Sequence, residues 1–389
     1  MARSNARIHD IAARRLSRRR FVQGTAALAA AGSLTRGRTI RLSAQETMTK
    51  ITWISPRGTL EVLDDYAYWT AKKMGYFGDL ETEIIPGILE ATSGSKAVAE
   101  GQADMSFVSP GVFSLGVEAG LDIVSVWHQV AQDTFDFAVP KGSGVTEVAQ
   151  LEGKTIALGD AGWSSIVDPM FAHAGVDPSS VRYVPIGAAW PQAVAQGQAD
   201  AALVWEGLRA QWSAQGLDYD YILGKDWSKL PANSFQIRRE DFEDAALTDL
   251  YTRYLRGWAM GLEFGYLNPR AATEITMNDP AISQALNAAF EDKAVAVESM
   301  WQNASIFRGD FATREGWGWH DMASWQLFLD TITELGQLTK EVKAEDIVKN
   351  DYVAGANDFD KAKVRADAEA YELTPEYEAV AVPEGAGLT

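Results

Sequence analysis

The sequence predicts an α/β protein of two related lobes, each built on a doubly wound and mainly parallel sheet. The segment AVAEGQAD at residues 97–104 returns as AVAQGQAD at residues 193–200, an offset of 96 residues. Over residues 97–122 and 193–218, 12 of 26 aligned positions are identical. A unit of about 26 residues that occurs only twice excludes a solenoid. Together with alternating strand and helix patterns, the duplication therefore favours two similar lobes.

Strand patterns occur around both copies of this segment. A short strand is predicted at residues 51–54, and a helix with one apolar face follows it and ends at Gly78. Further strands are predicted at 81–85, 105–108, 123–127, 135–139, 155–158 and 201–204. The apolar runs at 105–108 and 201–204 suit strands that are buried on both faces of a parallel sheet.

The chain is expected to cross between the lobes twice, as in a two-crossing hinge. Residues 45–139 and 235–345 are assigned to lobe 1 and residues 140–234 to lobe 2, with PKGSG at 140–144 as the linker. Helical patterns dominate after Asp241, at 247–267, 280–301 and 322–335. Residues 346–389 are predicted to be a partly disordered C-terminal extension, because the tail is acidic and contains Pro and Gly.

The first 44 residues differ in composition from the rest and indicate an export signal. They hold ten Arg, no Lys and a single acidic residue, Asp10. Arg18 and Arg19 precede a mildly apolar run at 25–34, which is typical of the twin-arginine type of signal. Such a run is too short to cross a hydrocarbon layer of ~30 Å. We expect an exported, periplasmic or otherwise extracytoplasmic protein whose mature chain has no integral membrane segment.

Charge and residue content argue against several functional classes. The net charge is −18, and it becomes −27 without residues 1–44, which carry ten positive charges and one negative charge. A strongly acidic protein is repelled by nucleic acid and by anionic lipid. The absence of cysteine excludes disulfides, thiolate metal sites and an acyl anchor. His128, His173 and His320 lack metal-ligand spacing, so we expect no metal, no cofactor and no catalytic residues.

Several short motifs, in this order and spacing, resemble one family. They are GYF at 75–77, the two GQAD segments, LEGKTIA at 151–157, AGVDP at 174–178 and NDFD at 357–360. Over about residues 50–370 the chain resembles the solute-binding proteins of ABC importers for nitrate, sulfonates, taurine and thiamine-precursor pyrimidines. The resemblance implies a two-lobed periplasmic-binding-protein fold that closes on a small-molecule ligand, with a cognate permease and ATPase as partners. We expect a monomer.

Ligands of open α/β sheets bind beyond the carboxyl ends of the strands. The repeat makes Val108 and Val204 equivalent strand ends, and the residues that follow each of them are expected to face the cleft. Tryptophans at the ends of two other strands, an arginine after the first strand, and a helix start after 155–158 complete the set. The candidate ligand-binding residues are Trp53, Arg57, Ser109, Trp127, Trp163, Ser164, Ser165, Trp205 and Glu206. Core packing, helix capping and surface exposure remain open alternatives for the individual residues.

The ligand is expected to be a small organic molecule with an aromatic or heterocyclic ring, such as a thiamine-precursor pyrimidine. Four tryptophans suit stacking on a flat ring, and Glu206 suits an amino group that donates to a carboxylate. Arg57, Ser164 and Ser165 leave a sulfonate, taurine or nitrate open. An enzyme of the pyrimidine-synthesis type on the same fold is the alternative of another class, but the cysteine-rich motif of that branch is missing here.

Overall fold

The computed structural model describes residues 50–57, 59, 60, 62–88 and 90–388. The predicted export signal at residues 1–44 lies outside these residues. Within them, no helix combines the length and the apolar character that a membrane span requires.

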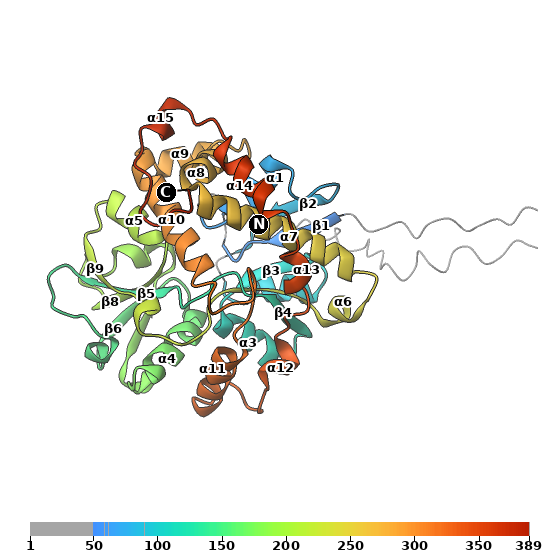
Figure 1. Ribbon diagram of the computed structural model, residues 1–389. Helices are drawn as coiled ribbons and strands as arrows, with labels where there is room; N and C mark the ends of the chain where they lie inside the picture. Colours follow the sequence, from blue (N-terminus) through green and yellow to red (C-terminus); the bar gives the residue numbers. More distant parts are fainter. Residues whose placement is uncertain (1–49, 58, 61, 89, 389) are drawn as a thin grey trace, which may run out of the picture. The chain divides into compact units, whose positions relative to one another are not determined.

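Two five-stranded sheets repeat one topology (Figure 1). Sheet 1 has the order β2 (Glu81–Ile85), β1 (Lys50–Ile54), β3 (Met105–Val108), β10 (Ser234–Arg238), β4 (Ile123–Trp127). Sheet 2 has the order β7 (Arg182–Pro185), β6 (Thr155–Leu158), β8 (Ala201–Trp205), β5 (Phe135–Pro140), β9 (Tyr219–Ile222). In each sheet one strand, β10 or β5, runs antiparallel to both neighbours, and the other pairings are parallel. The predicted fold class, with two lobes on mainly parallel sheets, is therefore confirmed.

The duplicated segment makes the same bonds in both sheets. Asp104 donates its N–H to the carbonyl of Thr52 over 2.9 Å, and its Oδ2 accepts the N–H of Thr52 at 2.9 Å. Asp200 is bonded to Thr155 in the same two ways, over 2.8 and 2.9 Å. The repeat is thus a structural device that joins the third strand of each sheet to the first.

The first crossing lies earlier in the chain than the sequence analysis places it. The strand that was assigned to the end of lobe 1 is β5, which pairs with β8 and β9 of sheet 2. The chain therefore passes between the sheets at residues 128–134 and returns at residues 223–233. The predicted linker at 140–144 is a turn within the second sheet region, with Gly142 and Gly144 at positive φ. A turn signal marks the end of a strand but does not tell which sheet that strand joins.

Fifteen α-helices are described, and they cover the two sheets unequally. Those between strands are α1 (Tyr66–Met74), α2 (Ser93–Ala99), α3 (Pro110–Glu118), α4 (Ser164–His173) and α5 (Leu208–Ala214). The later ones are α6 (Arg239–Glu243), α7 (Thr248–Leu267), α8 (Pro269–Met277), α9 (Ser283–Ala289), α10 (Lys293–Arg308), α11 (Met322–Glu334), α12 (Ala344–Ile347), α13 (Val353–Ala356), α14 (Lys361–Glu369) and α15 (Pro375–Glu378). The predicted helix at 280–301 is split into α9 and α10, because Asp292 caps a new helix by accepting the N–H of Ala294.

Helix α10 contacts α7 and α8, which pack with α1, and it also contacts α5 beside sheet 2. The C-terminal residues likewise pack on this helical layer. The composition of residues 346–389 predicts a partly disordered extension, whereas in the structure α13 and α14 pack against α7, and α15 packs against α8. Val364, Ala368 and Tyr377 are buried there. Few residues of this segment are buried against the helical layer, and most of their neighbours in the sequence are polar or acidic. For this reason composition alone indicates disorder.

Candidate ligand-binding site

A cavity lies where the carboxyl ends of the strands of both sheets meet. Its empty space is about 770 Å³, part of it open to solvent. Val108 and Ser109 reach it from the end of β3, and Trp205 from the end of β8. The other lining residues are Pro56, Arg57, Asp64, Ala91, Phe107, Val112, Val130, Thr134, Phe135, Trp163, Ile166, Asn233, Asn303 and Phe307. Residues of both lobes and of α10 therefore share one space.

Two indole rings form the wall from the second sheet. The rings of Trp163 and Trp205 meet edge to face, with centroids 5.8 Å apart at 80°. Trp190 stacks on Trp205 at 6.0 Å and 19°, and its Nε1 donates to the carbonyl of Leu203 over 2.9 Å. Because Trp190 is itself bonded to β8, it holds both lining indoles in place. Rigid aromatic surfaces of this kind favour a flat, apolar ligand group.

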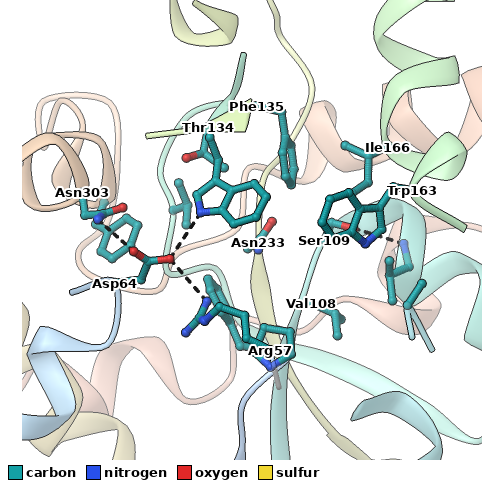
Figure 2. A pocket seen from close by; sticks show the side chains of 17 residues that line it. Arg57, Asp64, Val108, Ser109, Thr134, Phe135, Trp163, Ile166, Asn233 and Asn303 are labelled. Carbon is teal, nitrogen blue, oxygen red and sulfur yellow. Dashed lines mark hydrogen bonds and ion pairs between the residues drawn. The ribbon is translucent and has the colours of Figure 1, made fainter. Parts of the chain in front are cut away.

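The part of the cavity next to Trp205 is polar and centres on Asp64. Its Oδ1 accepts from Asn303 Nδ2 at 3.2 Å, and its Oδ2 accepts from Trp205 Nε1 at 3.4 Å. The guanidinium of Arg57 lies 3.4 Å from the same Oδ2, as Figure 2 shows. Asp64 thus joins the loop after β1, the end of β8 and helix α10.

The charge of Arg57 is compensated within the protein. Its second terminal nitrogen lies 2.6 Å from Oδ2 of Asp65, whose side chain is almost fully buried. Burial lowers the pKa of Arg57, but the carboxylates of Asp65 and Asp64 raise it more, so the guanidinium stays charged. Burial also raises the pKa of Asp64, against the smaller opposing effect of Arg57. One guanidinium and two carboxyl groups leave little positive charge for an anionic ligand.

A family model described as "NMT1/THI5 like" matches residues 65–272. This chain belongs to the NMT1/THI5-like family. The matched region runs from α1 into α8 and contains all of sheet 2. No curated protein sequence matches this NMT1/THI5-like chain significantly.

Solved structures resemble this family member in fold. The alkanesulfonate-binding protein of Xanthomonas axonopodis pv. citri, solved with MOPS, has a TM-score of 0.59 and 16% identity, covering 78% of this chain and 98% of that chain. The aliphatic sulphonate-binding protein of Escherichia coli has a TM-score of 0.51 and 14% identity, with coverages of 77% and 91%. A Candida albicans gene product with the generic periplasmic binding protein fold has a TM-score of 0.54 and 14% identity, with coverages of 78% and 96%. The NMT1/THI5-like chain thus has the periplasmic-binding-protein fold.

Four of the nine sequence-predicted site residues line the cavity, namely Arg57, Ser109, Trp163 and Trp205. Ser109 also caps α3, since its Oγ accepts the N–H of Val112 at 3.2 Å. Ser164 and Ser165 lie at the start of α4 but do not line the cavity. Ser165 is buried and donates its hydroxyl to the carbonyl of Gly162 over 2.7 Å, which turns it back into the helix start.

Trp53 and Trp127 are not cleft residues, contrary to expectation. Both are 0% exposed. Trp53 packs on Phe107 and Phe235 of sheet 1 and on Trp258 of α7. A Cβ added at Gly318 would lie 2.0 Å from the ring of Trp127, so the backbone at Gly318 packs directly on this ring. Their position at a strand end was predicted correctly, but the side chains point to the packed face of the sheet.

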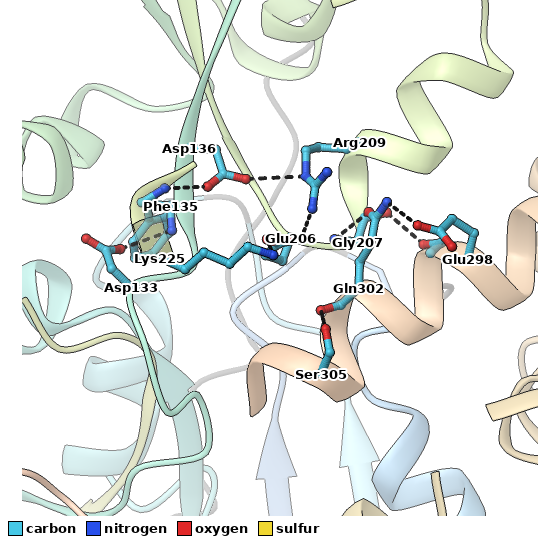
Figure 3. A network of polar contacts seen from close by, with 12 residues as sticks. Asp133, Phe135, Asp136, Glu206, Gly207, Arg209, Lys225, Glu298, Gln302 and Ser305 are labelled. Atoms are coloured by element: carbon cyan, nitrogen blue, oxygen red, sulfur yellow. Dashed lines mark hydrogen bonds and ion pairs between the residues drawn. The ribbon is translucent and has the colours of Figure 1, made fainter. Parts of the chain in front are cut away.

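Glu206 is also withdrawn from the cavity. It is 0% exposed, and it pairs with Arg209 and, over 3.0 Å, with Lys225, as Figure 3 shows. Asp136 belongs to the same cluster, where burial and the charge of Glu206 raise its pKa well above the ordinary value. Trp205 ends β8 and lines the cavity, whereas Glu206 is the first residue of the following turn and is not among the lining residues.

The carboxyl group at the cavity is Asp64, which the sequence analysis missed. Asp64 and Asp65 directly precede a helix and look like ordinary N-terminal residues of α1. Asn303 and Phe307 were also missed, because they belong to a C-terminal helix whose aromatic residues indicate packing. The sequence hints at the ion pairs of Arg57 only in that two adjacent acidic residues, Asp64 and Asp65, follow it closely.

A Ser–His–Asn chain of hydrogen bonds occurs elsewhere in this NMT1/THI5-like chain. Ser125 Oγ lies 2.9 Å from His320 Nε2, and His320 Nδ1 lies 3.0 Å from Asn350 Oδ1. Ser125 and His320 are fully buried, and none of the three lines the cavity. The chain therefore joins β4 to the C-terminal segments. In the described part of the chain, no cluster of three or more His, Asp or Glu side chains is placed to hold a metal ion.

Proposed function

We propose that this protein is the solute-binding receptor of an ABC importer. It captures a small organic ligand between its two lobes and delivers it to a membrane permease. Family membership, the periplasmic-binding-protein fold and a cavity shared by both sheets support this assignment. The lobes are then the two sheet regions, which close over the cavity about the crossings at residues 128–134 and 223–233. The protein acts outside the cytoplasm as a monomer and without catalysis.

The ligand class follows from the pairing of Arg57 with Asp64 and Asp65, which is the observation that carries this part of the proposal. A cavity whose guanidinium is matched by two carboxyl groups suits an uncharged or cationic ligand better than an anion. Trp163 and Trp205 offer faces and edges for a flat ring. An aromatic or heterocyclic compound with an amino donor, such as a thiamine-precursor pyrimidine, fits both features.

A sulfonate or nitrate receptor is the second candidate. The guanidinium of Arg57 at the cavity favours it, because this group can donate hydrogen bonds to the oxygens of a sulfonate or nitrate. Two of the solved structures of similar fold bear names of sulfonate-binding proteins, which raises this possibility without assigning a ligand.

A thermal-shift comparison tests the proposal. The probes are 4-amino-5-hydroxymethyl-2-methylpyrimidine, cytosine, taurine, methanesulfonate and nitrate, and mass spectrometry of denatured protein identifies any copurifying compound. A pyrimidine at ~100 times its Kd should stabilise the protein by about 2.7 kcal/mol. Asp64→Asn should weaken pyrimidine binding about tenfold, since a hydrogen bond to a charged group is worth roughly 1.5–3 kcal/mol.

The matched control is Asp218→Asn, which alters an exposed carboxylate remote from the cavity lining. If only the sulfonates or nitrate raise the melting temperature, and Asp64→Asn strengthens their binding, the second candidate is correct. If neither the probes nor any copurified compound binds, the receptor assignment fails.

A further inference from the structure

Helix α10 makes two hydrogen bonds to the backbone of Gly207, a residue of the second sheet region. The N–H of Gly207 donates to Gln302 Oε1 over 3.2 Å, and the carbonyl of Gly207 accepts from Ser299 Oγ at 2.7 Å. The side chain of Gln302 donates to Glu298 Oε1 over 3.1 Å, whereas Ser305 Oγ donates only to the backbone carbonyl of Gln302; Figure 3 draws both bonds. Ser299 is buried, so its bond is shielded from water.

These bonds connect the two sheet regions, which also contact each other where α3 packs on α4. Gly207 follows β8 and starts α5, both in the second sheet region. Helix α10 is packed on α7 and α8, which belong with α1 to the first. Asn303, next to Gln302, adds its bond to Asp64 at 3.2 Å. The contact therefore spans from one lobe to the other, beside the first crossing, where the N–H of Glu206 donates to the carbonyl of Thr134 over 3.1 Å.

Residue 207 must be a glycine for this contact to form. Its φ is +91°, and a Cβ there would lie 2.2 Å from Asn303 Nδ2. Two residues earlier, the same turn carries Trp205, which lines the cavity and donates to Asp64. The turn 205–207 therefore carries Trp205, which lines the cavity, and Gly207, which is bonded to α10.

We infer that Gly207, Ser299 and Gln302 form a latch that holds the lobes closed and positions Trp205 against Asp64. Ser299 and Gln302 are positioning residues, since they act on the cavity through the turn 205–207. Opening of the cleft has to break both bonds to Gly207. The inference rests on the proposed function for its purpose, which is retention of the ligand, but the latch itself consists of protein groups only.

The test measures the separation of the lobes without ligand. The chain contains no cysteine, so nitroxide labels can be attached at Glu81→Cys on sheet 1 and Asp218→Cys on lobe 2, both well exposed. Pulsed electron resonance then gives the distribution of distances between the labels. Gly207→Ala should add a population at longer distance. Gly216→Ala is the matched control, because its φ is +80° and a Cβ there meets nothing within 4 Å.

Ser299→Ala provides a second variant that leaves the backbone unstrained. Loss of one hydrogen bond should increase the open-to-closed ratio about fivefold, and amide exchange at Gly207 should accelerate by the same factor. Ser305→Ala, which removes a bond within α10, should change neither quantity. Circular dichroism verifies that each variant is folded.

The inference is overturned if Gly207→Ala and Ser299→Ala give the same distances as their controls, or if the wild type already has the distribution of Gly207→Ala. Failure of the receptor assignment would look different, because no compound would bind while the label distances still responded to Gly207→Ala.

Discussion

At the scale of single residues, two buried histidines tie the crossing segments together. The rings of His128 and His320 stack with centroids 5.3 Å apart at 8°. His128 Nε2 accepts the N–H of Ala232 at 3.1 Å, which links the first crossing to the second. Burial lowers the pKa of both, His128 well below its ordinary value and His320 to about 3, and the nearby Arg314 acts in the same direction. Both rings therefore function as neutral hydrogen-bonding groups.

We predict that acid destabilises the fold through these histidines. Because their pKa values are depressed in the folded state, unfolding takes up protons below the ordinary value of 6.5. The part of the free energy of unfolding that depends on neutral His128 and His320 is fully present above about pH 6.5. It is lost as the pH falls towards 3. For His320 alone the loss from pH 6.5 to pH 4 is about 3 kcal/mol.

Urea midpoints measured across this range check the prediction. His320→Gln should flatten the pH dependence, whereas His173→Gln, at a half-buried site, should leave most of it. An unchanged slope in His320→Gln would contradict the assignment.

At the scale of elements, the approach of α1 to α7 depends on glycines at every fourth position of α7. Gly257, Gly261 and Gly265 lie on one face of that helix. A Cβ on Gly261 would be 2.1 Å from the carbonyl oxygen of Ala67, and Cβ atoms on the other two would meet Phe77 and Tyr66 at 2.3 and 2.2 Å. Because α1 begins directly after Asp64 and Asp65, this packing also fixes the polar side of the site.

We predict that Gly261→Ala lowers the free energy of unfolding by about 3 kcal/mol, since the clash is with a backbone oxygen that no rotamer change relieves. Gly94→Ala, in α2, is the control. Its Cβ would meet Ser106 at an ordinary 3.4 Å, and the better helix propensity of alanine should leave stability unchanged or raise it by up to about 1 kcal/mol. Equal denaturant midpoints for the two variants would rule out close helix packing as the reason for Gly261.

At the scale of the whole molecule, the repeat in the sequence predicts two similar sheets. It does not predict which residues, distant in the chain, meet at the cavity. The repeat places Ser109 and Trp205 at equivalent strand ends, and both line the cavity. It says nothing about the side to which a strand-end residue points, so Trp53 and Glu206 were assigned to the cleft. Asp64 and Asn303 are 239 positions apart, and no local pattern records that they meet.

The C-terminal residues are part of the folded body, and we predict that their loss destabilises it. Tyr377 is 2% exposed and lies on α15, which packs on α8 and α10. Tyr377→Ala should cost about 3 kcal/mol, the usual effect of removing a buried aromatic ring. Its exposed neighbour provides the control, since Glu376→Ala should stay within about 0.5 kcal/mol. Thermal unfolding measures both, and a Tyr377→Ala variant as stable as wild type would mean that the segment is only loosely attached.

The antiparallel strand in each sheet has a consequence for the order of folding during synthesis. Sheet 2 is built from residues 135–222 without interruption, whereas β4 joins sheet 1 through β10, which begins at Ser234. The chain leaving the ribosome can therefore complete its second sheet while the first still lacks its antiparallel strand. Until β10 emerges, β3 presents an unpaired edge to other chains. The lobe that is synthesised first is the lobe that is finished last.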